Sequence, residues 1–160
     1  MEQAIFAAGC FWGVQYYFDQ VPGVVSTTVG YTGGTTEDPT YEDVCSHTTG
    51  HAEAVLVEFD PGKVSGEWRG KHFFRLHDPT QLNRQGPDIG DNYRSAIFCV
   101  TDDQKEIAEK VRDEVQPKFG KPIVTQIELA GPFYEAEDYH QKYTEKTGRG
   151  ACHVPYEPVN

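Results

Sequence analysis

The sequence predicts a single-domain α+β fold, a two-layer sandwich of a mixed β-sheet and flanking helices. Strand-like and helix-like segments are intermixed along the chain rather than separated into blocks. Glycine and proline breaks are spread evenly, and no internal repeat marks a second unit. The 160 residues, 38% of them hydrophobic, suffice for one buried core. We therefore expect residues 1–160 to form one domain with a ferredoxin-like core, long irregular loops and a coil tail.

The first predicted elements are a buried strand, a tight turn and a helix. Residues 4–8 form a small, apolar run that ends at Gly9, and Cys10 follows. Apolar residues at helical spacing come next: Val14, Tyr17, Phe18 and Val21. Cys10 therefore lies at or near the first helical turn, where unpaired amides and the helix macrodipole favour an anion.

Cys10 is the candidate nucleophile. We expect its pKa to lie below the reference value of about 8.5 for a thiol, because the helix terminus stabilises a thiolate. Phe11 and Trp12 follow at the turn exit and are expected to wall the space that the thiol faces. A buried, inert cysteine is the ordinary alternative, but the strand-to-helix position favours a reactive one.

Further along, β-branched alternation predicts a strand over 24–31, and the glycine- and threonine-rich segment 32–41 is predicted to be a loop ending at Tyr41. Alternation over 51–59 predicts the next strand, in which Glu53 shares its face with two valines and a phenylalanine. Burial without a cation would raise the pKa of Glu53 and leave it a proton donor near neutral pH. The alternative, a solvated Glu53 at a frayed strand end, is equally consistent with the alternation.

The remaining elements are predicted from the same two patterns, helical spacing of apolar residues and strand-like alternation. Helices are predicted over 64–76, 101–115 and 136–143, and strands over 95–100 and 123–129. The polar stretch 77–94 is too long for a simple connection, and long ordered loops tend to be functional. Residues 148–160 show no periodicity and are expected to form a mobile tail that contains Cys152.

Composition excludes several classes of partner. The net charge of −11 and the scattered 14 Lys and Arg residues argue against nucleic acid and anionic membranes. No run reaches transmembrane length, and the N-terminus lacks the features of a secretory signal, so we expect a cytoplasmic monomer.

The cysteine and histidine spacings do not indicate a metal or another cofactor. The four cysteines contain no Cys-x-x-Cys pair and should be free thiols in a reducing compartment. His47 and His51 are four residues apart, as zinc ligands on helices often are, but the residues between them are poor helix formers. Cys45 and Cys99 lie in or beside structured segments and are expected to be bystanders.

Several separated motifs together resemble the type A peptide methionine sulfoxide reductases, over about residues 5–156. These motifs are Gly9-Cys10-Phe11-Trp12-Gly13, Gly50-His51-Ala52-Glu53-Ala54-Val55, His77-Asp78-Pro79-Thr80, Arg84-Gln85-Gly86 and Tyr93-Arg94-Ser95. The resemblance implies reduction of the S epimer of methionine sulfoxide, free or in proteins, with thioredoxin as the reductant.

The same resemblance implies a role for each candidate residue. Cys10 matches the nucleophile, Glu53 the proton donor, and Phe11 and Trp12 the methyl pocket. Three more positions complete the implied site: Tyr41 and Tyr93 match hydroxyls that bind the sulfoxide oxygen, and Asp88 matches a carboxylate that positions substrate and water. The tail offers Cys152 as the resolving cysteine of a two-cysteine cycle.

Two functions of other classes stay open at this point. Thiol-based acyl transfer would use Cys10 with a histidine base and would consume no reductant. A noncatalytic module would bind methionine side chains or peptides in the aromatic pocket, with Cys10 structural.

Overall fold

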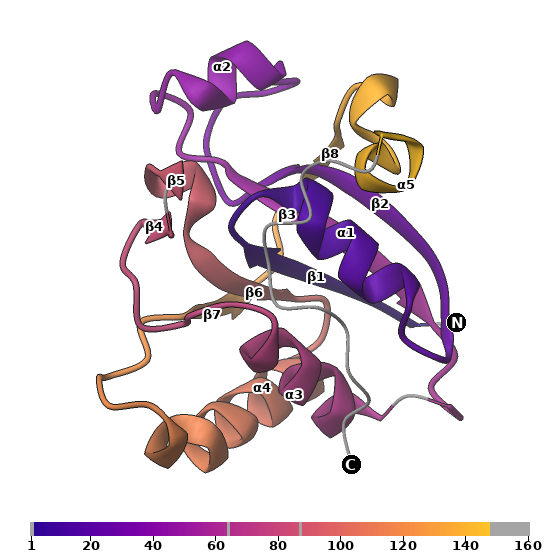
Figure 1. The fold of residues 1–160 in the computed structure, drawn as a ribbon, viewed down its shortest axis with the longest axis vertical. Helices are drawn as coiled ribbons and strands as arrows, with labels where there is room; N and C mark the ends of the chain where they lie inside the picture. The colour runs from indigo at the N-terminus through magenta and orange to yellow at the C-terminus, as the bar shows by residue number, and fades with distance from the viewer. Residues whose placement is uncertain (1, 64, 87, 148–160) are drawn as a thin grey trace.

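The structure, a computed structural model, describes residues 2–63, 65–86 and 88–147 (Figure 1). The predicted mobile tail 148–160, with Cys152, lies outside the described residues. No helix of the described part is long and apolar enough to cross a membrane.

The described chain is built on a six-stranded sheet with the order β7-β6-β1-β3-β2-β8. Its strands are β1 (Glu2–Ala8), β2 (Val24–Thr32), β3 (Ala52–Phe59), β6 (Ser95–Cys99), β7 (Gln126–Leu129) and β8 (Phe133–Glu135). The β6–β7 pair is parallel and the other pairs are antiparallel. The predicted mixed sheet is thus confirmed. A separate two-stranded sheet joins β4 (Arg84–Gln85) to β5 (Asp88–Ile89).

The three longest helices, α1 (Phe11–Asp19), α3 (Gly66–Arg75) and α4 (Asp102–Val115), pack on one face of this sheet (Figure 1). The other α-helices are α2 (Tyr41–Cys45) and α5 (Tyr143–Thr147), and the 3₁₀ turns are η1 (Asp91–Tyr93), η2 (Gln116–Lys118) and η3 (Asp138–His140). At the centre of the layer, the ring of Phe6 stacks on Phe18 of α1 and on Phe73 of α3, with centroids 4.9 and 5.6 Å apart. This packing fixes α1, and with it Cys10, against the sheet.

The opposite face of the sheet carries a smaller apolar cluster, which includes Ile5, Ala54 and Phe98. Because strand side chains alternate between faces, Glu53 lies on the helix-covered face with Val55 and Val57. The alternation of β3 was therefore predicted correctly, and it directs Glu53 toward α1.

Three predicted segments differ from the structure. The loop predicted over 32–41 is followed by α2, which begins with a capping box between Thr40 and Asp43. The strand predicted over 123–129 starts only at Gln126, and the short strand β8 was missed. The helix predicted over 136–143 is wrong: it is two short helical segments separated at Lys142, whose φ of 58° interrupts helical geometry.

Candidate active site

Cys10 lies where β1 turns into α1, as the sequence predicted. Gly9 has a φ of 93°, a left-handed conformation that glycine adopts without steric cost and that ends the strand. Cys10 is the N-cap residue of α1, it is half-buried, and its side chain makes no capping hydrogen bond. The thiol is therefore held at the amino-terminal end of a nine-residue helix.

Glu53 is buried, with only 2% of its surface exposed, so the solvated alternative is wrong. Its Oε1 accepts a hydrogen bond from the backbone N–H of Phe11 at 3.3 Å, and its Oε2 accepts one from Asn92 Nδ2 at 3.4 Å. The first bond ties the carboxyl to the residue next to Cys10. In both of these bonds the carboxyl oxygen is the acceptor.

Two tyrosines from separate segments accompany Glu53. Tyr41 is the first residue of α2, and Tyr93 is the last residue of η1. Burial raises the pKa of both phenols, a hydrogen bond with Cys45 raises that of Tyr41 further, and Glu53 raises both when it is ionised. The pKa of Tyr93 is also raised by Cys45 and Asp88 and, least of these, by Cys10, an effect that requires Cys10 to be a thiolate. Both phenols stay protonated at physiological pH and can donate hydrogen bonds.

Asp88 comes from the small hairpin that follows α3. It lies on β5, is half-buried, and pairs in register with Gln85 of β4. Its charge contributes to the raised pKa of Tyr93, after burial and the charges of Glu53 and Cys45. The charges of Glu53, Cys45, Asp88 and Cys10 all raise the pKa of Tyr93, so these groups lie within electrostatic range of one phenol.

Aromatic rings form the wall beside Cys10. Phe11 is fully buried and packs on Tyr31, with centroids 5.7 Å apart. Trp12 is partly exposed and stacks on Tyr143 of α5 at a centroid distance of 4.0 Å. The Trp12 indole Nε1–H donates to His140 Nδ1 at 2.9 Å. Chain segments more than 120 residues apart therefore build this wall.

Four polar residues of the site were not identified from the sequence: Tyr31, Asn92, Glu137 and His140. Glu137 Oε1 accepts a hydrogen bond from the Tyr31 hydroxyl at 2.9 Å, and Oε2 accepts one from the Tyr41 backbone N–H at 3.1 Å. Burial opposes ionisation of Glu137, but hydrogen bonds from its own backbone, Tyr41 and Tyr31 hold its pKa below the usual value. The i, i+3 spacing of Glu137 and His140 was the one available signal of a shared orientation.

The other described cysteines are poor nucleophiles. Burial raises the pKa of Cys45, although a hydrogen bond with Tyr41 partly opposes this. Burial raises the pKa of Cys99 to about 11. Both side chains stay thiols at neutral pH, and a thiol is far less nucleophilic than a thiolate.

The histidine pair at positions 47 and 51 has structural partners. His51 accepts a hydrogen bond from Gly34 N at Nδ1, and its Nε2 lies 2.6 Å from the carbonyl of Thr36. His47 instead faces Asp91, at 3.6 Å. The two imidazole rings therefore contact different residues. Among the described residues there is no group of three or more potential metal ligands.

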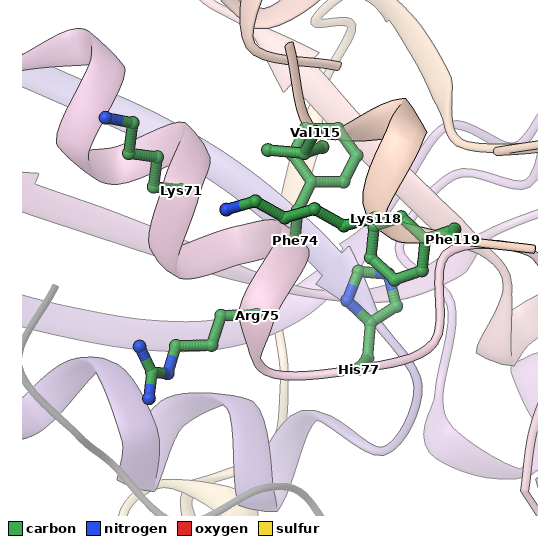
Figure 2. A pocket seen from close by; sticks show the side chains of 7 residues that line it. All are labelled: Lys71, Phe74, Arg75, His77, Val115, Lys118 and Phe119. Atoms are coloured by element: carbon green, nitrogen blue, oxygen red, sulfur yellow. The ribbon is translucent and has the colours of Figure 1, made fainter. Parts of the chain in front are cut away.

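A separate hollow of about 380 Å³ lies between α3 and the end of α4 (Figure 2). It is lined by Lys71, Phe74, Arg75, His77, Val115, Lys118 and Phe119. None of the predicted site residues lines it, and the His77 ring inside it is engaged by Phe73 O and Ser95 Oγ, at 2.9 and 2.7 Å. This hollow is therefore distinct from the site around Cys10.

Comparisons with known proteins agree with one another. A family model described as peptide methionine sulfoxide reductase matches residues 2–160. Peptide methionine sulfoxide reductase MsrA of Methanoculleus marisnigri is 54% identical, over 95% of this chain and 94% of the relative. Reduced Mxr1 from Saccharomyces cerevisiae superposes with a TM-score of 0.92 at 36% identity, over 98% of this chain and 92% of that one. The crystal structure of Mxr1 in complex with Trx2 is also similar, with a TM-score of 0.66 at 27% identity, over 98% and 90% of the two chains.

Proposed function

The chain belongs to the peptide methionine sulfoxide reductase family, a family of oxidoreductases, and we propose that its Cys10 reduces the S epimer of methionine sulfoxide, free or in proteins. The observation that carries the assignment of the site is the hydrogen bond from Phe11 N–H to buried Glu53. It holds a carboxyl beside the residue that the helix terminus favours as a thiolate.

In the proposed reaction the Cys10 thiolate attacks the sulfoxide sulfur while Glu53 delivers a proton to the sulfoxide oxygen. Protonation makes the sulfur electrophilic, so the acid and the nucleophile act together. The protonated hydroxyls of Tyr41 and Tyr93 would bind the oxygen, and Asp88 would position substrate and water. Transfer of the protonated oxygen from the substrate sulfur to Cys10 Sγ, with release of methionine, leaves Cys10 as a sulfenic acid.

Phe11 and Trp12 are proposed to hold the methyl group of the substrate. The partly exposed Trp12 supplies apolar surface, which suits a methyl group, and the fully buried ring of Phe11 lies beside that of Trp12. The two ring centroids lie 6.5 Å apart, and the ring planes are tilted by 38°.

Turnover of separated methionine sulfoxide epimers with a thiol reductant tests this function. We expect reduction of the S epimer, with methionine formed in proportion to the thiol consumed, and at most traces of activity on the R epimer. Equal rates on both epimers would contradict the proposed specificity, and no methionine from either would contradict the reaction itself.

The alternatives left open by the sequence gain little support. Acyl transfer requires an imidazole base beside the thiol. His140 is in the same aromatic wall, but its Nδ1 accepts the Trp12 N–H. A noncatalytic module would not require a carboxyl buried beside the thiol, which is costly to desolvate.

Cys152 is proposed to resolve the sulfenic acid to a disulfide, which thioredoxin then reduces. The raised pKa values of Cys45 and Cys99 disfavour either as the attacking thiolate. The complex of the similar protein Mxr1 with Trx2 supports a thioredoxin as the reductant.

Replacing Cys152 with serine should separate the chemical step from recycling. The variant should still form one equivalent of methionine per enzyme, but thioredoxin-dependent turnover should fall by at least about 100-fold, because the disulfide that thioredoxin attacks never forms. Quantified methionine in single and multiple turnover measures both quantities, with Cys45→Ser as the matched control. Sustained turnover by Cys152→Ser with thioredoxin, or a Cys10–Cys45 bridge found by peptide mapping, would remove Cys152 from this role.

We also propose that residues 1–160 form one catalytic domain with a ferredoxin-like core. In support, the central strand order β6-β1-β3-β2 is antiparallel throughout, with α1 between β1 and β2 and α3 between β3 and β6. The proposal extends to a monomer in a reducing compartment such as the cytoplasm, where free thiols persist.

A further inference from the structure

His140 is embedded in the aromatic wall beside Cys10, with 1% of its surface exposed. Its ring centroid lies 5.2 Å from that of Phe11, 5.6 Å from that of Trp12 and 4.5 Å from that of Tyr41. Its one direct side-chain hydrogen bond among the described residues is the 2.9 Å contact from the Trp12 indole. These three aromatic rings therefore surround the imidazole, and the Trp12 indole is its one hydrogen-bond donor among the described residues.

The donor and acceptor roles in this contact are determined by chemistry. An indole Nε1–H can only donate, so His140 Nδ1 must be the acceptor, and the neutral ring carries its proton on Nε2. Burial lowers the pKa of His140, although Glu137 partly opposes this, so the neutral form is favoured. Protonation would place an N–H on Nδ1, opposite the indole N–H, and would break the bond.

His140 Nε2 is buried and has no hydrogen-bond partner among the described residues. A buried polar group without a hydrogen-bond partner costs free energy, so its presence needs an explanation. A phenylalanine would fill the same space without that cost, but it could not accept the Trp12 hydrogen bond. The feature that distinguishes His140 from a phenylalanine at this position is therefore the acceptor Nδ1, which binds the Trp12 N–H.

We propose that His140 is a positioning residue that fixes the indole of Trp12 through Nδ1, and with it the shape of the pocket for the substrate methyl group. This proposal rests on the proposed function. Stacking on Tyr143 restrains the plane of the indole but leaves it able to slide, whereas the hydrogen bond to His140 fixes its direction. His140 thereby affects substrate binding without touching the reacting atoms.

The test compares His140→Phe with His140→Asn. Asparagine can place its side-chain oxygen close to the position of Nδ1, whereas phenylalanine keeps a ring but offers no acceptor. We expect His140→Phe to raise KM for methionine sulfoxide about tenfold with a smaller change in the single-turnover rate, and His140→Asn to stay within about threefold of wild type. In a double-mutant cycle, Trp12→Phe combined with His140→Phe should be no worse than the poorer single variant.

A spectroscopic readout keeps this test independent of activity. The chain has two tryptophans, so the ¹⁵N spectrum of the indole groups is simple to assign with Trp12→Phe. The Trp12 Nε1–H should exchange slowly with solvent in wild type and His140→Asn, and at least about tenfold faster in His140→Phe. Equal exchange in all three proteins, or independent and multiplicative losses in the cycle, would overturn the positioning role. Slow exchange without any sulfoxide turnover would instead refute the proposed function and leave the contact intact.

Discussion

Replacing Cys10 with serine is expected to abolish sulfoxide reduction, by more than about 10⁴-fold, because a serine hydroxyl is not ionised at neutral pH. It also cannot take up the sulfoxide oxygen as a sulfenic acid does. The fold should survive, because Cys10 occupies the N-cap of α1, where serine is among the preferred residues and can cap backbone N–H groups that the thiol leaves uncapped. Methionine formed in a single turnover, at matched folded concentration, measures the loss.

Cys45→Ser is the matched control for this experiment. Cys45 is half-buried like Cys10 and lies close enough to Tyr41 to affect its pKa, but its own pKa is raised by burial. This variant should keep activity within about threefold of wild type, as expected for a thiol that is not the nucleophile. Comparable activity in Cys10→Ser and wild type would require another nucleophile.

Glu53→Gln should produce the second largest effect, a loss of about 10²- to 10⁴-fold in the single-turnover rate, since a general acid contributes this much. Glutamine can still accept the Phe11 N–H but cannot deliver a proton. Rotation of the Asn92 amide would turn its buried, unpartnered Oδ1 toward the new amide, so the variant should fold. Rapid-quench measurement of methionine formation isolates this step.

The pH dependence provides a second measurement on the same variant. If Glu53 is the acid, the wild-type rate should fall as rising pH removes its proton, whereas the thiolate of Cys10 is gained as pH rises. In Glu53→Gln the fall of the rate at high pH should disappear, whereas the rise caused by formation of the Cys10 thiolate should remain. Glu58→Gln, on the opposite face of β3, is the control and should behave as wild type. An unchanged rate in Glu53→Gln would transfer the acid role to Tyr41, Tyr93 or water.

The parts of the site that the sequence predicted depend on short-range patterns. The apolar run ending at Gly9 is enough to place Cys10 at the start of α1, because a strand, a left-handed glycine and a helix are local structures. The alternation in β3 is enough to place Glu53 on the covered face, but burial was left open because it depends on α1 packing over that face.

The parts that were missed depend on contacts between distant segments. The strand β8 has three residues, too few for an alternation to be recognised, and it exists because it pairs with β2. Glu137 was not identified because its partners, Tyr31 and Tyr41, lie about 100 residues earlier in the chain. No periodicity could have related His140 to Trp12, since the hydrogen bond that joins them spans 128 positions.

The two edges of the six-stranded sheet determine how readily another polypeptide could add a strand to it. The edge strands are β7 with four residues and β8 with three, and Pro132, which lacks an N–H, directly precedes β8. Short edges give an unfolded polypeptide little backbone on which to add a strand. We therefore expect little strand addition at these edges by the oxidised proteins that are substrates in the proposed function.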